Sequence, residues 1–183
     1  MAVVKATSTT SDWYVGHRSL LATGVNNGLK LNSSQAYTYG GLGPGQTDIW
    51  VNANRPGSLV VSSGGNTNTN GVTYVAYLFA HNAGGFGLTG ADNVVSCGSF
   101  TTDGTGAAGN ITLGYEAQWI LLKRSDGVGS WNIIDTMRGS SLTSYNYLQP
   151  NTTSLESSST SAGQGIFPTA TGFFVGTNFP AAS

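Results

Sequence analysis

Charged residues are scarce in this sequence: Lys, Arg, Asp and Glu make up 8% of its 183 residues, against about 25% in an average soluble domain. Seven basic and eight acidic residues leave a formal net charge of −1. Binding to nucleic acid or to an anionic membrane surface needs clustered basic side chains, and no such cluster is present. We therefore expect neither partner. The chain should still fold, because 39% of its residues are hydrophobic and lie in compact runs.

Cysteine is limited to Cys97, which excludes an intrachain disulfide framework and leaves stability to packing and assembly. Its apolar surroundings predict a buried small hydrophobe. No apolar run approaches the roughly 20 residues that span a bilayer. The opening run ends at Lys5 and is too short for the apolar core of a secretory leader. We therefore expect a protein that stays in the cell or leaves by another route, such as lysis.

No segment keeps the apolar spacing of an amphipathic helix, because Gly, Ser, Thr and Asn interrupt it throughout. Short apolar runs bounded by turn residues instead predict β-strands. The stronger candidates are residues 13–18, 58–61, 73–81, 118–124, 131–137 and 172–175, and the weaker ones are residues 29–32, 94–100, 111–113 and 147–149. The expected fold is all-β, a β-sandwich.

Two of these strands, within residues 73–80 and 118–123, are apolar on both faces. In the second, Trp119 and Leu121 point one way, and the apolar residues that follow each of them point the other. A strand of an ordinary sandwich has one wet face. We therefore expect both strands in a sheet covered on both sides, either by a second layer or by a neighbouring subunit.

The chain also repeats itself. Residues 1–5 and Trp13 are matched by residues 119–123 and Trp131, at one offset (123 − 5 = 118 and 131 − 13 = 118). Further along, the match is looser. The spacing predicts that both halves are built on the same pair of strands.

The repeat predicts two diverged β halves, residues 1–90 and 91–183, which share one sandwich core or pack as tandem subdomains. The halves are unequal, because the second lacks a counterpart of residues 73–80 and the first lacks the lead-in at 110–117. Either the sequence is trimmed at this point, or a neighbouring copy supplies the missing strand by β-augmentation.

The second half carries short motifs that read NITLGYEAQWILLKRSD, WNIIDTMR, NYLQPN and GFF, at residues 110–126, 131–138, 146–151 and 172–174. Together with TYVAYLFA at residues 73–80, they resemble a module of tailed-bacteriophage structural proteins, found in tail fibres and other virion appendages. The resemblance is good over most of residues 100–178 and fainter over residues 1–80. One departure is Ala117, where the module usually has proline.

This resemblance implies a virion structural protein: a tail fibre, an appendage or a capsid decoration. Such a protein acts by self-assembly, with identical copies and neighbouring virion proteins as partners, and adhesion to a host surface glycan is a further expected role. The expected location is the virion, assembled in the host cytoplasm. The module carries no catalytic motif to transfer, so neither an enzyme activity nor a cofactor is expected.

Catalytic chemistry has little support in the residues themselves. His17 and Asp135 occupy equivalent positions of the two halves (17 + 118 = 135), and a pseudo-twofold axis could bring them together. However, no nucleophile spacing completes a triad, and two polar residues at a sheet or subunit edge fit better. The eight acidic residues are scattered, mostly in turns, and no metal-ligand cluster is present.

Aromatic residues indicate one candidate binding site. Tyr37, Tyr39 and Trp50 lie among glycines and have no obvious match in the second half. Exposed, they would bind a glycan or a protein partner; covered, they would close the end of the sandwich. Two rival functions follow. A glycan- or receptor-binding module predicts exposed aromatics converging in a groove, and an appendage glycan hydrolase predicts two carboxylates about 5–9.5 Å apart in a cleft.

Overall fold

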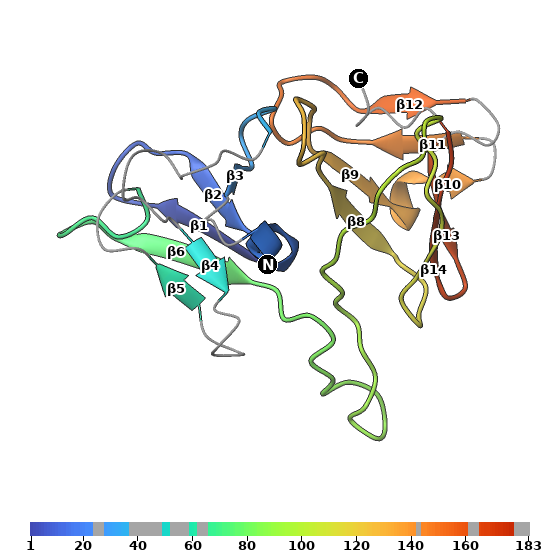
Figure 1. The fold of residues 1–183 in the computed structure, drawn as a ribbon, viewed down its shortest axis with the longest axis horizontal. Helices are drawn as coiled ribbons and strands as arrows, with labels where there is room; N and C mark the ends of the chain where they lie inside the picture. Colours follow the sequence, from blue (N-terminus) through green and yellow to red (C-terminus); the bar gives the residue numbers. More distant parts are fainter. Residues whose placement is uncertain are drawn as a thin grey trace.

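A computed structural model describes residues 1–23, 28–36, 49–51, 59–61, 66–141, 144–160 and 165–177. These residues form strands, turns and irregular segments, and helix within them is confined to two short 3-10 turns. The predicted all-β fold class is therefore confirmed. Figure 1 shows two groups of strands side by side, with a long loop extending from between them.

In chain order, the strands of the described residues are β1 (Ala2–Ala6), β2 (Trp13–Gly16), β3 (Leu29–Lys30), β4 (Ile49–Val51), β5 (Leu59–Val61), β6 (Tyr74–Leu78), β7 (Gly109–Thr112), β8 (Trp119–Leu122), β9 (Asn132–Asp135), β10 (Ser140–Ser141), β11 (Ser144–Tyr147), β12 (Ser157–Ser159), β13 (Ile166–Thr169) and β14 (Gly172–Val175). The 3-10 turns η1 (Arg18–Thr23) and η2 (Thr136–Arg138) follow β2 and β9.

The first half is built on an antiparallel sheet in the order β3-β2-β1-β6. Its central strands are short runs of valine and aromatic residues, which favour extended backbone. Val3 and Val15 pair across these strands and are buried on one face, while Val4 and Tyr14 are buried on the other. The β4–β5 hairpin lies against β1, β2 and η1. The central pair of strands is thus buried on both faces.

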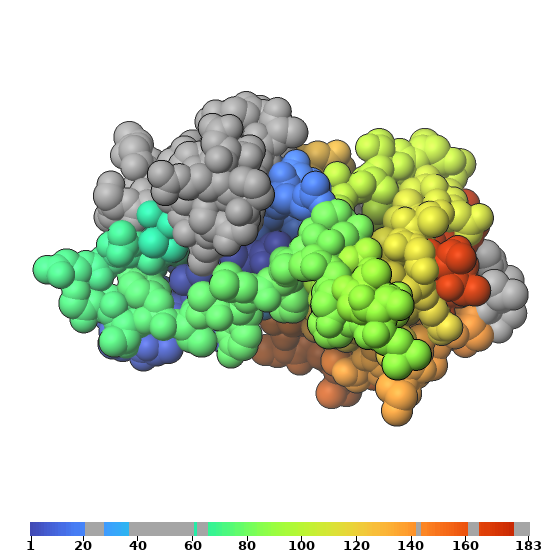
Figure 2. Space-filling model, turned by 90° about the horizontal axis from the view of Figure 1, so that it is seen from below, coloured from blue at the N-terminus to red at the C-terminus, as the bar shows by residue number. Residues whose placement is uncertain are grey.

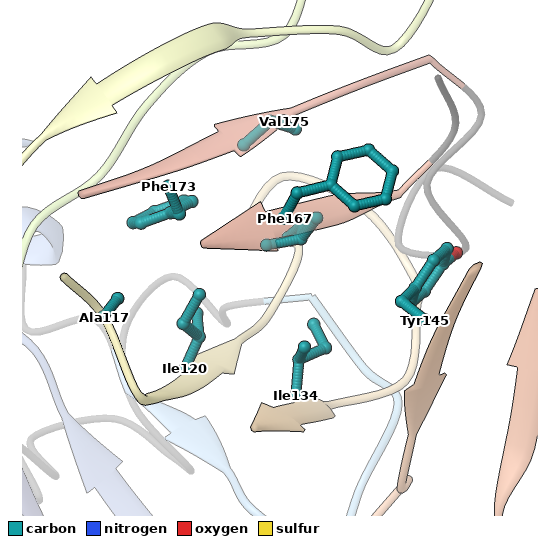
Figure 3. Packing of buried hydrophobic residues seen from close by; sticks show 8 residues of the cluster. Ala117, Ile120, Ile134, Tyr145, Phe167, Phe173 and Val175 are labelled. Carbon is teal, nitrogen blue, oxygen red and sulfur yellow. The ribbon is translucent and has the colours of Figure 1, made fainter. Parts of the chain in front are cut away.

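The second half is a two-layered β-sandwich. One layer contains β8 and β9 and continues, through a bridge between Ile133 and Leu148, into the β10-β11-β12 sheet. The other layer is the sheet β13-β14-β7. Buried side chains from the two layers face each other (Figure 3) and form the second-half core: Ala117, Ile120, Ile134, Tyr145, Ile166, Phe167, Phe173 and Val175.

The internal repeat is confirmed by strand register. Val3 pairs with Val15 in β1–β2, and 118 residues later Leu121 pairs with Ile133 in β8–β9. The pairs that flank these two on either side follow the same offset. A register conserved along a hairpin fixes which side chains share a face. The two halves therefore present the same faces to their surroundings.

Hydrogen bonds extend the repeat beyond the strands. The main-chain N–H of Trp13 donates to Oδ1 of Asn32 at 3.0 Å, and that of Trp131 donates to Oδ1 of Asn151 at 2.8 Å. The two asparagines are 119 residues apart (151 − 32 = 119), so the second half holds one extra residue before this point. The looser match expected here from sequence is therefore a one-residue insertion.

Equivalent faces of the two halves pack against each other. Val3, Val15, Leu20, Leu29 and Trp131 form the shared core. Partly buried hydrophobic side chains surround it: Met1, Trp13, Leu31, Phe79 and Leu121. Trp131 directly precedes β9 yet is buried among first-half residues, and its indole N–H donates to the carbonyl oxygen of Lys30 at 2.8 Å. One side chain of the second half thus completes the core of the first. The predicted division at residue 90 stays a prediction.

Lys123 also joins the halves. Its Nζ donates to the carbonyl oxygens of Ser34 at 3.3 Å and of Arg124 at 2.6 Å. The equivalent Lys5 donates to the carbonyl oxygen of Ala6 at 2.9 Å. Burial, and secondarily the charge of Arg124, lower the pKa of Lys123 to about 8. Both lysines therefore close the turn that follows their strand, and in the second half the same amine reaches across to the first.

The predicted double covering holds for β8. Ile120 belongs to the second-half core, and Leu121 packs from the opposite face against the shared core. In β6, Ala76, Tyr77 and Leu78 are exposed, so no second layer of the described residues buries this end of the strand. Strand β6 lies at the edge of its sheet, and its covering by a neighbouring subunit stays a prediction.

The weak strand predicted at residues 94–100 is wrong. This segment has no strand pairing among the described residues and belongs to an irregular loop. Cys97 within it is buried, as expected, and is a free thiol. Cys97 packs at the base of that loop, and local strand propensity yields to this packing.

Candidate functional site

A long arm projects from the body of the protein between β6 and β7. We define the arm as residues 80–96; in Figure 1 it is the green loop that leaves β6 and extends below both groups of strands. Seen from below, it lies in front of the body, next to both halves (Figure 2). A segment of this length without strands of its own is unusual in a compact domain, and such loops are commonly functional.

The arm is ordered by bonds between its two legs. The N–H of Asn82 donates to the carbonyl oxygen of Val95 at 2.9 Å, and the Ser96 hydroxyl donates to Oδ1 of Asn82 at 2.6 Å. Nearer the tip, the N–H of Asp92 donates to the carbonyl oxygen of Phe86 at 3.1 Å. These contacts make a long irregular hairpin, so the arm presents its side chains in a defined arrangement.

Glycine sets the shape of the tip. Gly87 has φ +73°, and a Cβ built on it would collide with the carboxylate of Asp92. An L side chain at this position would be strained by its backbone and blocked by Asp92. The turn at the tip therefore requires glycine at position 87.

The base of the arm is tied to the body. The N–H of Phe79 donates to the carbonyl oxygen of Met1 at 2.9 Å, and the Phe79 side chain packs on the shared core. The N–H of Cys97 donates to Nδ1 of His81 at 3.0 Å. An acceptor nitrogen requires the neutral imidazole. Consistent with this, burial and the charge of Arg18 lower the pKa of His81.

The arm exposes apolar side chains. Leu88 at the tip is fully exposed, and Leu78, Phe86 and Val94 are 64%, 51% and 48% exposed. Between the legs and the end of β6 lies a hollow of about 210 Å³, with an apolar lining: Leu78, Phe79, Ala80, Ala83, Gly84, Phe86, Val94 and Val95. Contiguous exposed apolar surface on a folded protein marks an interaction site.

Charge is scarce around this surface, because Asp92 is the one charged residue in the sequence of the arm. No Lys, Arg, Asp or Glu occurs between Arg55 and Asp92, a stretch that includes all of β6 and most of the arm. A partner would therefore bury most of this surface with few ions to desolvate, and the desolvation of ions is the costly part of a polar interface. The arm and the end of β6 together form the candidate functional site.

His17 and Asp135 are equivalent in structure as well as in sequence. Nδ1 of His17 accepts from the N–H of Ser19 at 3.2 Å, and Oδ1 of Asp135 accepts from the N–H of Arg138 at 2.9 Å. Each side chain thus caps the 3-10 turn that follows its strand. The described residues show no bond between the two, so the pseudo-twofold axis does not bring them together.

Burial, with a smaller contribution from nearby positive charges including Arg18, lowers the pKa of His17 to about 4. The unfolded chain therefore takes up this proton first as the pH falls. The contribution of neutral His17 to the free energy of unfolding is fully present above about pH 6.5 and is lost progressively toward pH 4. Allowing for solvent screening of the partly exposed ring, we expect a loss of about 2 kcal/mol.

Urea unfolding between pH 7.5 and pH 4.5 measures this loss. His17→Asn keeps a capping acceptor without titrating in this range, so it should flatten the profile by about 2 kcal/mol. His81→Asn is the matched control and should flatten it less, because His81 is exposed. A His17→Asn profile as steep as that of the wild type would contradict the assignment.

Two carboxylates meet at Arg138. Its Nε lies 2.7 Å from Oδ2 of Asp135, and its Nη1 lies 3.3 Å from Oε2 of Glu156. A guanidinium shared by two carboxylates is a structural ion-pair arrangement, in which both acids are engaged by Arg138. Asp103 caps its own turn, accepting from Thr105 at 2.8 Å, as expected for acids in turns. Neither arrangement supports hydrolysis.

The described residues contain no group of three or more His, Cys, Asp or Glu side chains placed to hold a metal ion. Nor does this part of the chain contain a helix long and apolar enough to cross a membrane. Of the predicted binding residues, Tyr37 and Tyr39 lie outside the described residues. Trp50 lies in β4, and its side chain is outside them too. Their role stays a prediction.

The geometry defines an all-β protein of two repeated halves with a projecting apolar arm. Residues 1–177 match the family model described as a domain of unknown function (DUF7483), so the chain belongs to that family. No curated protein and no solved structure matches the chain.

Proposed function

We propose that this protein is a structural component of a tailed-bacteriophage virion that acts by self-assembly. The proposal places it in a fibre, an appendage or a capsid decoration, with identical copies and neighbouring virion proteins as partners. Its location is then the virion particle, assembled in the host cytoplasm. No enzymatic role is proposed.

The observation that carries the proposal is the ordered, almost uncharged arm. The exposed apolar side chains of the arm and of the end of β6 gather around one hollow, and contiguous apolar surface of this kind marks an interaction site. Burying one such side chain in an interface is worth about 1.5–3 kcal/mol. The low charge of the whole chain supports the same conclusion, because copies with few charges pack closely without repulsion.

The sequence motifs supply the second line of support. The resemblance to phage structural modules covers most of residues 100–178, and its motifs at residues 110–138 include most of β7, all of β8 and β9, and the turn η2. This segment contributes Leu121 and Trp131 to the shared core. The motif residues thus contribute to the core between the two halves, which is the role expected of them in a structural protein. Adhesion to a host glycan through Tyr37, Tyr39 and Trp50 stays a further prediction.

A charge at the tip of the arm tests the proposal. Leu88→Asp should weaken self-association at least tenfold, because the carboxylate would be buried at the contact while the fold is unaffected. Leu155→Asp is the matched control, since Leu155 is 89% exposed on the other half. Sedimentation velocity over a wide concentration range measures the self-association constant of each variant and of the wild type.

Two results would contradict the proposal. A wild-type protein that stays monomeric at the highest attainable concentration excludes self-assembly as its function. Self-association that is equally strong in Leu88→Asp and in the wild type excludes the arm as its site.

A further inference from the structure

The two halves differ at one sheet edge. In the first half, β1 pairs with β2 on one side and with β6 on the other. In the second half, the equivalent β8 pairs with β9, and no strand of the described residues pairs with its other edge. Trp119 at this edge is 50% exposed, and in the view from below the yellow part of the chain around residue 120 reaches the surface beside the arm (Figure 2).

Hydrogen-bond parity shows which amides face this open edge. The N–H of Thr136 donates to the carbonyl oxygen of Gln118 at 3.1 Å, so even-numbered residues of β8 bond to β9. Antiparallel ladders alternate at every residue. The N–H and C=O groups of Trp119 and Leu121 therefore point away from β9, toward the open edge.

Among the residues that the structure describes, no strand pairs with the outer edge of β6 either. The N–H of Phe79 bonds to Met1 and that of Thr7 bonds to Thr73, so the odd-numbered residues of this segment face β1. The main-chain groups of Ala76 and Leu78 then face outward. Leu78 is also 64% exposed and lines the hollow at the base of the arm.

The sequences of the two strands carry none of the usual protection of an edge. Natural sheets guard exposed edges with lysine, proline, bulges or covering loops. Strands β6 (YVAYL) and β8 (WILL) contain no charged residue and no proline. Both are apolar on both faces. An unguarded apolar edge is a template for pairing with another strand.

We propose that β6 of one copy pairs antiparallel with β8 of a second copy, giving a continuous sheet across the contact. This inference rests on the proposed function and names its partner as a second copy of this chain. The repeat supports this partner: β8 has the register and the flanking hairpin of β1, but not the second neighbour that β6 gives to β1. Strand β6 would offer β8 its outward edge, which is the edge that β1 does not use.

The contact joins two different edges, so it is head-to-tail. In such a pair, one copy keeps a free β8 and the other keeps a free β6. Heterologous contacts of this kind close into rings or continue as filaments, depending on the rotation between copies. The arm follows directly after β6, so the β6 edge and the apolar arm lie at the same end of the interface.

Proline blocks each edge separately. Ala76→Pro removes an outward N–H from β6 at an exposed side chain, and Trp119→Pro does the same at the first residue of β8, where proline is tolerated. Each variant alone should associate at least tenfold more weakly than the wild type. Ala76→Thr and Trp119→Thr keep the N–H groups and are the matched controls. Sedimentation velocity measures association, and circular dichroism checks the fold.

Mixing the two blocked variants gives the decisive result. Ala76→Pro retains an open β8 and Trp119→Pro retains an open β6, so an equimolar mixture should form a capped 1:1 dimer. Like-edge pairing, β6 with β6 or β8 with β8, predicts no such dimer and would overturn the inference. If a proline variant fails to fold, Leu78→Lys and Trp119→Lys provide a second pair of blocks.

The inference and the proposed function fail in different ways. A wild-type protein that never associates overturns both. Association that Leu88→Asp weakens and neither proline variant changes overturns the inference alone and leaves the proposed function in place.

Discussion

Trp131→Ala is expected to destabilise the protein by about 3–5 kcal/mol, the usual cost of deleting a large buried aromatic side chain. Trp131 is 3% exposed and packs among Val3, Val15 and Leu29 of the other half. Its indole N–H donates to Lys30, whose carbonyl oxygen would lose this partner. Chemical denaturation followed by circular dichroism measures the loss.

The location of the damage distinguishes this prediction from an ordinary cavity. Trp131 belongs to the second half, yet amide exchange should accelerate in β1 and β2, because the indole fills the core of the first half. Trp131→Phe keeps most of the apolar bulk and should cost about 1–2 kcal/mol through the lost hydrogen bond.

Trp13→Ala is the matched control for Trp131→Ala. Trp13 holds the equivalent position but is only partly buried, stacked on the ring of Tyr77 with centroids 6.2 Å apart. Trp13→Ala should therefore lower the free energy of unfolding clearly less than Trp131→Ala does. Equal losses for the two alanine variants would contradict the asymmetric role assigned to Trp131.

The repeat was predictable from sequence because it rests on few, bulky residues. Tryptophan and lysine at a fixed offset of 118 residues mark the same two strands, and strand alternation then assigns the faces. The structure adds that equivalent faces meet, which spacing alone does not determine. Sequence indicates which strands are alike, and packing decides how they are arranged.

Several strands escaped prediction for identifiable reasons. Strands β10 (Ser140–Ser141) and β12 (Ser157–Ser159) are serine runs with weak strand propensity, and they form only by pairing with β11. Strand β13 contains Pro168, which argues against a strand in sequence; it is tolerated because β13 lies at the edge of its sheet.

The candidate site was not predictable, because exposure is a property of the folded molecule. Residues 94–100 resemble a strand because valine is a strand former, and Phe86 and Leu88 resemble ordinary core residues. One signal was available: the stretch between Arg55 and Asp92 has no charged residue. A surface loop normally carries charge, so an uncharged stretch rich in glycine and apolar residues is a usable sign of an interface.

Gly172→Ala is expected to destabilise the second half by about 3 kcal/mol or more, although it adds a single methyl group. Gly172 pairs with Thr112 across β14 and β7. A Cβ built on it would collide with the carbonyl oxygen of Ile111 and lie 3.1 Å from the N atom of Leu113. Both are backbone atoms, which cannot rotate away, so the two strands would have to separate. The carbonyl oxygen of the preceding residue, Thr171, also accepts from Leu113 at 2.8 Å, and that bond would be strained.

Gly104→Ala is the control for this substitution, because its added Cβ would have no neighbour within 4 Å and Gly104 does not have a left-handed backbone. It should change stability by less than about 0.5 kcal/mol. Urea unfolding of both variants makes the comparison, and a Gly172→Ala loss below about 1 kcal/mol would mean that β7 and β14 can separate freely. The expected large loss would explain why the GFF motif begins with glycine: at this position the close approach of two strands leaves no room for a side chain.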